Sequence, residues 1–338
     1  MNEQTAITVL GAGSWGTALA IQFARIGQRT ILWGREDDRL DLLEAHRENR
    51  QFLPDAPFPD SLEIEPDLEK AVGSAHIVLV VVPSHVFRVT LESIRSFLRE
   101  DARLAWATKG FELATGKLPH QVAEEVLGPG IPKAVLSGPT FAKEVGAGLP
   151  SAMTVAATDE AYAQELAESI SGETFRAYTS TDIIGLEVGA AVKNVLAIGA
   201  GICDGLGFGA NTRVALITRG LVEMTRLGIA LGAQPATFMG LAGMGDLVLT
   251  CTDNQSRNRR MGLALAAGKT VAEAEKEIKQ VVEGVKAAEA VHRVAIGLGV
   301  EMPICHQIYR LLYEGADPRE AVNALMQRAL KSEFSPEA

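Results

Sequence analysis

Residues 6–33 read AITVLGAGSWGTALAIQFARIGQRTILW, and this stretch decides the fold of the first half of the chain. A β-branched run leads into a glycine-rich turn, a helical stretch follows, and a second β-branched run closes the unit at residues 30–33. Gly11, Gly13 and Gly16 form a GxGxxG between the first strand and the helix. The glycine pattern alone has low specificity, but in this strand–helix–strand context it predicts a dinucleotide-binding unit.

Each glycine of this turn has a physical purpose. Gly11 permits the tight turn, Gly13 lets a pyrophosphate approach the backbone, and Gly16 lets the helix pack close to the strand. The free N–H groups at the start of the helix would face the anion.

The end of the second strand bears on the choice of cofactor. The chain reads WGRED there, with Arg35 where an acid usually binds the ribose 2′-hydroxyl of NAD. A guanidinium suits a 2′-phosphate, so we expect NADP or NAD, with NADPH favoured. Two alternatives stay open: Arg35 is only a solvated loop charge, or the neighbouring Glu36 serves NAD.

The pattern of short strands and longer helices continues, and it predicts a doubly wound α/β fold with a parallel sheet. The further strands are expected at HIVLVVVP (76–83), RLAWAT (103–108), AVLSGPT (134–140), SAMTVAAT (151–158) and TFRAY (174–178). Ligands gather beyond the carboxyl ends of such strands, where VVPSH, TKG and SGPTFA stand. Lys109 of TKG is expected to contact a phosphate or carbonyl group; the alternative is that it extends to solvent.

After about residue 182 the pattern changes to helical periods with glycine breaks. It predicts a Rossmann-type NAD(P)-binding domain at 1–182 and an all-α substrate and catalytic domain at 183–338. Lys193 lies in an apolar helical stretch of the second domain, and a buried lysine is costly unless paired or used. Burial and nearby positive charge would lower its pKa toward the range for proton transfer. The alternative is a lysine on an exposed stripe of the helix.

Three further polar positions stand out in the second half. Asp246 follows a Gly-Met-Gly turn, where an aspartate is most often a helix cap, and Glu283 would by default be a surface residue. Residues 251–262 read CTDNQSRNRRMG, which places three arginines in an otherwise acidic chain. The segment therefore indicates a local anion site.

Bulk composition limits the functional classes. The length of 338 residues favours two domains, and a formal charge of −10 argues against a general nucleic-acid binder. Cys203, Cys251 and Cys305 are too dispersed for disulfides or a metal site and indicate a reducing, cytoplasmic location. We expect no signal peptide and no membrane span, because charged residues interrupt the longest apolar segment.

Several blocks together resemble a known family, from about residue 6 to about residue 330. They are GAGSWGTALA, VVVPSH, ATKG, SGPTFAKEVGAGLP, AVKNVLAIGAGICDGLGFGAN, GDLVLTCTDNQSRNRR and VVEGV. The set is similar to bacterial NAD(P)-dependent sn-glycerol-3-phosphate dehydrogenases. The resemblance implies a Rossmann domain followed by an all-α domain like that of 6-phosphogluconate dehydrogenase. It also implies reversible reduction of dihydroxyacetone phosphate to sn-glycerol 3-phosphate, a precursor of glycerophospholipids.

The resemblance also implies roles for individual residues. Lys193 would be the proton acceptor or donor. The substrate would be bound by Lys109, Gly138, Thr140, Lys193, Asp246, Ser256, Arg257 and Asn258. Beyond the three glycines, the cofactor would be contacted by Ser14, Trp15, Arg35, Lys109, Ala142, Arg257, Val281 and Glu283. Trp15 stands where some members have another aromatic ring.

Other functions remain open at this point. A 3-hydroxyacid dehydrogenase of the same two-domain build would use arginine to bind a carboxylate. A non-catalytic NAD(P)-binding regulator should lack the two cationic side chains at 109 and 193. An RNA-binding role for SRNRR has the least support, because no stacking aromatic residues accompany the segment. For partners we expect the small-molecule substrate and a homodimer, while the NAD/NADP ratio and feedback regulation stay undetermined.

Overall fold

The computed structural model describes residues 6–329 and 332, which form two compact units. The first unit comprises 6–108 and 119–183, and the second comprises 109–118 and the chain from 184 onward. Segment 109–118 groups with the second unit because Phe111 and Leu118 are buried in its apolar core. The outermost residues of both predicted domains, 1–5 and 330–338 except 332, lie outside the described part.

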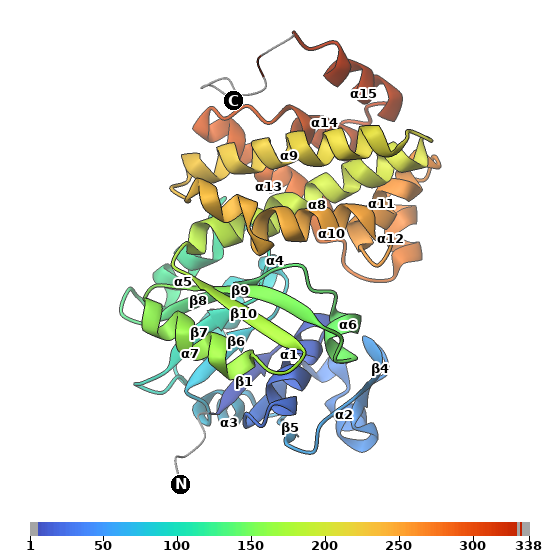
Figure 1. Cartoon of the computed structure of the whole chain (residues 1–338). Helices are drawn as coiled ribbons and strands as arrows, with labels where there is room; N and C mark the ends of the chain where they lie inside the picture. The colour runs from blue at the N-terminus through green and yellow to red at the C-terminus, as the bar shows by residue number, and fades with distance from the viewer. Residues whose placement is uncertain (1–5, 330–331, 333–338) are drawn as a thin grey trace. The chain divides into compact units, whose positions relative to one another are not determined.

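The first unit alternates strands and helices along the chain (Figure 1). Its strands are β1 (Ile7–Leu10), β2 (Thr30–Trp33), β3 (Glu48–Asn49), β4 (Leu53–Pro57), β5 (Leu62–Ile64), β6 (Ile77–Val80), β7 (Arg103–Trp106), β8 (Lys133–Ser137), β9 (Ser151–Ala157) and β10 (Phe175–Ser180). Its helices are α1 (Ser14–Arg25), η1 (Glu36–Asp38), α2 (Leu40–His46), α3 (Leu68–Gly73), α4 (Ser84–Ile94), α5 (Pro119–Leu127), α6 (Ala142–Gly146) and α7 (Glu160–Ile170). The predicted doubly wound α/β class is confirmed.

Eight strands form one sheet in the order β10-β9-β8-β7-β6-β1-β2-β5. β1 pairs in parallel with β2 and β6, with Ile7 opposite Thr30 and Ile77. Every residue of β1 and β6 is buried, which explains why both are continuous apolar runs in the sequence. The pairing of β8 with β9 is antiparallel, which the expectation of a parallel sheet did not include. The intervening segment carries only the short helix α6, and β9 returns antiparallel beside β8.

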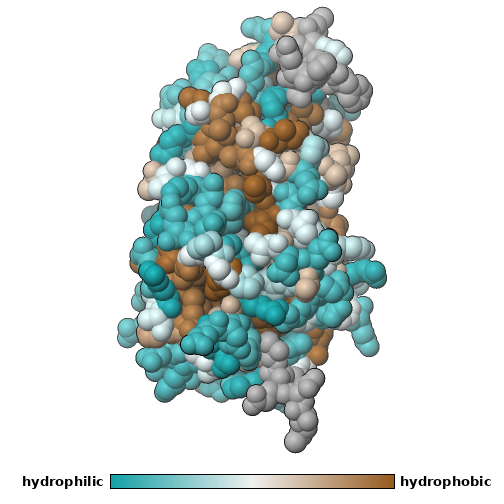
Figure 2. All heavy atoms as spheres, turned by 90° about the vertical axis from the view of Figure 1, so that its left-hand side faces the viewer, coloured by the Kyte–Doolittle hydropathy of each residue, from teal (hydrophilic) through white to brown (hydrophobic). Residues whose placement is uncertain are grey.

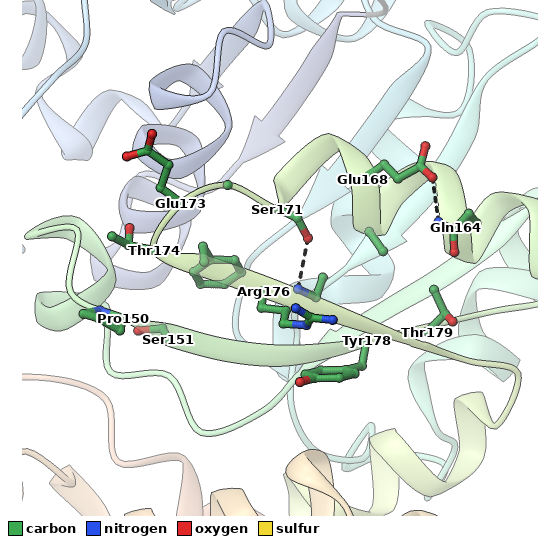
Figure 3. Close-up of a pocket in the computed structure, with 14 residues that line it drawn as sticks. Pro150, Ser151, Gln164, Glu168, Ser171, Glu173, Thr174, Arg176, Tyr178 and Thr179 are labelled. Carbon is green, nitrogen blue, oxygen red and sulfur yellow. Dashed lines mark hydrogen bonds between the residues drawn. The ribbon is translucent and has the colours of Figure 1, made fainter.

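Strand β10 forms one edge of the sheet, and residues 171 and 172, just before it in the chain, hydrogen-bond to part of this edge. Ser171 Oγ accepts from the N–H of Ala177 at 3.0 Å, and the N–H of Gly172 donates to the carbonyl of Phe175 at 2.8 Å. A groove of about 590 Å³ runs along this edge, and Arg176 lies over the ring of Tyr178 there (Figure 3). These bonds occupy edge groups that could otherwise pair with a foreign strand. None of the predicted site residues lines this groove.

The second unit is helical in its described part. Its elements are α8 (Ile183–Gly205), α9 (Ala210–Ala230), η2 (Pro235–Met239), η3 (Leu241–Gly245, a π-helical turn), α10 (Asp246–Thr252), α11 (Arg257–Ala266), α12 (Val271–Ile278), α13 (Glu283–Leu298), α14 (Pro303–Tyr313) and α15 (Pro318–Met326). Helix α8 is long and apolar enough to cross a membrane, but 94% of its most apolar window is buried inside the protein. It is the central helix of this unit's core.

Large apolar side chains that stay exposed are spread over many helices, a strand and loops. Examples are Val89 on α4, Val214 on α9 and Ile296 on α13. On the face drawn in Figure 2, hydrophobic regions are interrupted by hydrophilic ones. Large exposed apolar patches mark docking surfaces, and these scattered side chains do not define one.

Candidate active site

The glycine-rich turn between β1 and α1 is sterically specified. Gly11 has φ +122°, and a Cβ built on it would lie 2.3 Å from the carbonyl oxygen of Val81. A Cβ on Gly16 would lie 1.9 Å from the carbonyl oxygen of Gly11. A Cβ on Gly13, in contrast, would meet no atom within 4 Å. Packing therefore requires glycine at positions 11 and 16, whereas Gly13 leaves the backbone accessible to a ligand.

The start of α1 offers free donors beside this open position. Gly13 is the N-cap, and no side chain caps the helix. Within the described residues, the N–H groups of Gly13, Ser14 and Trp15 donate to no acceptor, and Trp15 Nε1 is buried without a partner. First-turn N–H groups together with the helix dipole attract anions. The turn thus fits the pyrophosphate of a dinucleotide.

Arg35 follows the carboxyl end of β2 and is exposed. Its backbone N–H donates to Asp38 Oδ2 at 2.7 Å, which fixes the backbone while the guanidinium reaches solvent. Glu36 is exposed beside it. The geometry therefore permits a 2′-phosphate contact and leaves both alternatives for this loop open.

The SGPTFA block forms a tight turn after β8. Gly138 has φ +156°, and a Cβ there would lie 2.8 Å from Cα of Met153. Thr140 Oγ1 donates to the carbonyl of Gly138 at 3.2 Å, and Ala142 begins helix α6. The backbone of this candidate contact segment is thus fixed by sterics and by a local hydrogen bond.

Lys193 lies in the middle of α8 with only 4% of its surface exposed. Its Nζ forms an ion pair with Asp246, which is 2% exposed, and donates to Thr250 Oγ1 at 3.4 Å. Thr250 Oγ1 donates in turn to Asp246 Oδ1 at 3.3 Å. These contacts exclude an exposed stripe for the lysine. The aspartate is not the cap of helix α10 either, because Gly245 is the N-cap and no side-chain cap bond is formed there.

Glycines bring the lysine and the aspartate together. A Cβ on Gly189 would lie 2.6 Å from the carbonyl oxygen of Ala242, so α8 and the π-helical turn η3 touch backbone to backbone. Lys193 and Asp246 each come four residues later on their own segments, which is one helical turn along the same face. π-helical turns often accompany functional sites.

The environment lowers the pKa of Lys193 to about 8. Burial is the largest cause, the Asp246 carboxylate opposes it, and the nearby Lys109 ammonium lowers the pKa further. Lys109 is half-buried and belongs to the same unit. An amine with this pKa exchanges protons readily near neutral pH.

A second polar cluster joins α8, α11 and α13. Asn258 Nδ2 donates to Asn194 Oδ1 at 2.8 Å, and Asn258 Oδ1 accepts from the N–H of Gly284 at 2.9 Å. Asn194 Nδ2 lies 3.5 Å from Glu283 Oε2, a long hydrogen bond. Val281, just before α13, is exposed. The predicted residues Asn258 and Glu283 are thus linked through a residue that sequence reasoning did not select.

The arginine-rich segment divides into different environments at the start of α11. Ser256 Oγ caps the helix by accepting from the N–H of Arg259 at 3.2 Å. Arg259 forms an ion pair with Asp204 and is buried. Arg257 is half-buried, and its guanidinium makes no hydrogen bond or ion pair with any described residue. It is therefore available to an anion.

The predicted residues thus fall into groups within each unit. The first unit holds Gly11, Gly13, Ser14, Trp15, Gly16, Arg35, Gly138, Thr140 and Ala142. The second holds Lys109, Lys193, Asp246, Ser256, Arg257, Asn258, Val281 and Glu283. Sequence reasoning missed Thr250 and Asn194, although spacing offered a signal: Thr250 is one helical turn after Asp246, and Asn194 is next to Lys193.

Comparisons with known proteins cover nearly the whole chain. A model of the N-terminus of NAD-dependent glycerol-3-phosphate dehydrogenase matches residues 6–163, and one of the C-terminus matches 182–323. The chain is 58% identical over 334 residues to a glycerol-3-phosphate dehydrogenase of Aeromonas salmonicida, covering 98% of this chain and 100% of the relative. It is 59% identical, at the same coverage, to that of Aeromonas hydrophila.

A solved structure agrees with this assignment. The crystal structure of glycerol-3-phosphate dehydrogenase from Coxiella burnetii is 45% identical, with a TM-score of 0.93 over 96% of this chain and 99% of that chain. With both domains matched, this chain belongs to the NAD-dependent glycerol-3-phosphate dehydrogenase family.

Proposed function

We propose that this protein catalyses reversible hydride transfer between NAD(P)H and dihydroxyacetone phosphate, giving sn-glycerol 3-phosphate for glycerophospholipid synthesis. The observation that carries the chemistry is the buried Lys193 paired with Asp246 in a chain of this family. We assign the reaction to the cytoplasm, in keeping with the free thiols, and to a homodimer.

Residues of the first unit hold most of the cofactor in this proposal. The N–H groups of Gly13, Ser14 and Trp15 bind the pyrophosphate, and Arg35 binds the 2′-phosphate of NADP. Ala142, together with Val281, Glu283, Lys109 and Arg257 of the second unit, completes the set. When bound, the nicotinamide supplies or accepts the hydride at the substrate C2 carbon.

Lys193 exchanges the proton. In reduction its ammonium donates to the C2 oxygen, and in oxidation its neutral amine takes that proton back. Asp246 and Thr250 fix the position of Nζ. Lys109 is the second cation, and it stabilises negative charge that develops on the C2 oxygen.

The remaining residues bind the substrate. The guanidinium of Arg257 pairs with the phosphate, and Ser256 and Asn258 stand beside it at the start of α11. Gly138 and Thr140 supply the contact from the turn after β8. A polar set with an unpaired arginine suits a phosphorylated three-carbon ketone.

The rival 3-hydroxyacid dehydrogenase differs in its substrate anion, a carboxylate. A panel of dihydroxyacetone phosphate and 3-oxo acids, followed by the ultraviolet absorbance of NADPH, distinguishes the two. We expect turnover with the phosphorylated ketone. Faster turnover with a 3-oxo acid would overturn the assignment, and tight NADPH binding without turnover of any ketone would favour the regulator.

The pKa of Lys193 predicts opposite pH profiles for the two directions. Reduction needs the protonated amine, so its kcat/KM should fall as the pH rises through about 8. Oxidation of sn-glycerol 3-phosphate needs the neutral amine, so its kcat/KM should rise through the same pH. Initial rates in both directions check this. Profiles that bend in the same direction would contradict the role of the lysine.

Arg35→Ala should change the preference between cofactors. Loss of one charge-assisted contact to the 2′-phosphate should raise the KM for NADPH about 10- to 100-fold and leave that for NADH within about threefold. Arg39→Ala is the control, because Arg39 already pairs with Asp41 at 2.8 Å. A wild-type enzyme that prefers NADH by more than about tenfold would contradict the use of Arg35.

A further inference from the structure

Asn49, the last residue of β3, has a buried side-chain amide with no role in the proposed hydride and proton transfer. Its Nδ2 donates to the carbonyl of Ala12 and to Thr17 Oγ1, both at 2.8 Å. Its Oδ1 accepts from the N–H of Phe52 at 3.1 Å. Since the nitrogen must donate and the oxygen must accept, the orientation of the amide is fixed.

Two of these bonds reach the glycine-rich turn. Ala12 is the residue between Gly11 and Gly13, and Thr17 lies in the first turn of α1. Thr17 Oγ1 also lies 3.4 Å from the carbonyl of Ala12, within hydrogen-bonding distance. The carbonyl of Ala12 is therefore held by two donors on the inner side of the turn.

Holding this carbonyl also fixes the next N–H group. In a trans peptide the C=O of Ala12 and the N–H of Gly13 point to opposite sides, and the described chain has no cis peptide. With the carbonyl turned inward to Asn49, the N–H of Gly13 points outward. That N–H is one of the free donors at the start of α1.

The hairpin that carries Asn49 is itself anchored. Ser14 Oγ donates to the carbonyl of Phe52 at 2.7 Å, which adds a second tie between turn and hairpin. At the base of the hairpin, Arg47 Nη2 donates to the carbonyls of Pro59 and Leu62 at 2.7 and 2.8 Å. Asn49 therefore bonds the glycine-rich turn from a hairpin that is itself held in place by hydrogen bonds.

We infer that Asn49 is a positioning residue for the pyrophosphate of the cofactor. It acts through the peptide between Ala12 and Gly13 and does not touch the ligand. The inference rests on the proposed function, because it requires the turn to bind a dinucleotide. It adds to that function a residue outside the GxGxxG pattern that sets the direction of a phosphate donor.

Asn49→Asp tests the inference with an isosteric change. The aspartate keeps an oxygen for the N–H of Phe52 but replaces the donor nitrogen by an oxygen facing the carbonyl of Ala12. We expect the Kd for NADPH, measured by isothermal titration calorimetry, to rise about 10- to 100-fold. The kcat at saturating NADPH and the KM for dihydroxyacetone phosphate should stay within about threefold.

Gln22→Glu is the matched control. Gln22 is a buried amide of the same helix α1, and its Nε2 donates to the carbonyl of Ile170 at 3.0 Å. The chemical change is the same, amide to carboxylate, and the bond lost is again one donated to a backbone carbonyl, here away from the turn. Its Kd for NADPH should stay within about threefold of wild type. An equal loss of affinity in both variants, or wild-type affinity in Asn49→Asp, would overturn the inference.

A second variant keeps the test decisive if Asn49→Asp does not fold. Thr17→Val nearly preserves volume and removes the hydroxyl that bonds Asn49, so we expect NADPH to bind about 3- to 10-fold more weakly. Unchanged affinity in this variant would also count against the inference. Failure of the proposed function looks different, because it is seen in the wild-type chain, which would then either bind no NADPH or bind NADPH without reducing dihydroxyacetone phosphate.

Discussion

Lys193→Ala is expected to lower kcat for the reduction of dihydroxyacetone phosphate with NADPH by about 10²- to 10⁴-fold. The lysine is buried, and Asp246 and Thr250 hold its ammonium in place. Alanine leaves no group at this position that can give a proton to the C2 oxygen. A loss smaller than about tenfold would contradict a general acid role.

The same substitution leaves the carboxylate of Asp246 buried without its cation. Breaking a buried ion pair typically costs about 3–5 kcal/mol of stability, so reduced activity must be separated from reduced folding. The double variant Lys193→Ala with Asp246→Asn removes the uncompensated charge. We expect it to regain thermal stability without regaining kcat.

Lys133→Met is the control for the loss of a buried lysine. Lys133 lies in β8, is 6% exposed, and its Nζ donates weakly to the carbonyl of Pro129 at 3.4 Å. Its kcat should stay within about threefold of wild type, because this lysine has no part in the proposed chemistry. An equal fall in kcat in Lys193→Ala and Lys133→Met would mean that removing any buried lysine lowers activity, and would contradict a specific role for Lys193.

Much of the fold could be predicted because its signals are local. The central strands are buried along their whole length and therefore read as apolar runs, and the glycines of the turn follow from steric contacts within one strand–helix unit. Strands β3, β4 and β5 were not predicted. They are short, β4 carries two prolines, and Asn49 is held by the glycine-rich turn 32 to 37 residues away. Such strands depend on tertiary contacts.

In the candidate active site, too, the features set by contacts between distant segments could not be predicted from the sequence. The composition of α8 could not decide whether Lys193 points into the core or to solvent. That choice follows from the close approach of Gly189 to Ala242, which lie more than 50 residues apart in the sequence. The interpretation of Asp246 was equally undecided, because its partner comes from another helix. Residue types and spacing identified the candidates, and tertiary packing determines how they pair.

Arg257→Ala is expected to raise the KM for dihydroxyacetone phosphate about 10- to 100-fold, the range for loss of a charge-assisted hydrogen bond. Arg257 is the first residue of α11, where the helix dipole also favours an anion. Its guanidinium has no partner among the described residues, whereas that of Arg259 is already paired with Asp204. The neighbouring arginine should therefore not substitute for it.

Dihydroxyacetone, which lacks the phosphate, separates phosphate binding from other effects of Arg257→Ala. If the guanidinium acts on the phosphate, kcat/KM for dihydroxyacetone at saturating NADPH should be about equal in wild type and variant, while kcat/KM for the phosphorylated ketone falls. Arg310→Ala removes the same charge from an exposed pair with Glu314 and should change neither value. An unchanged KM for dihydroxyacetone phosphate in Arg257→Ala would remove this residue from the phosphate site. An equal loss with both ketones would instead mean that Arg257 acts only through the cofactor or through the fold of α11, and not on the phosphate.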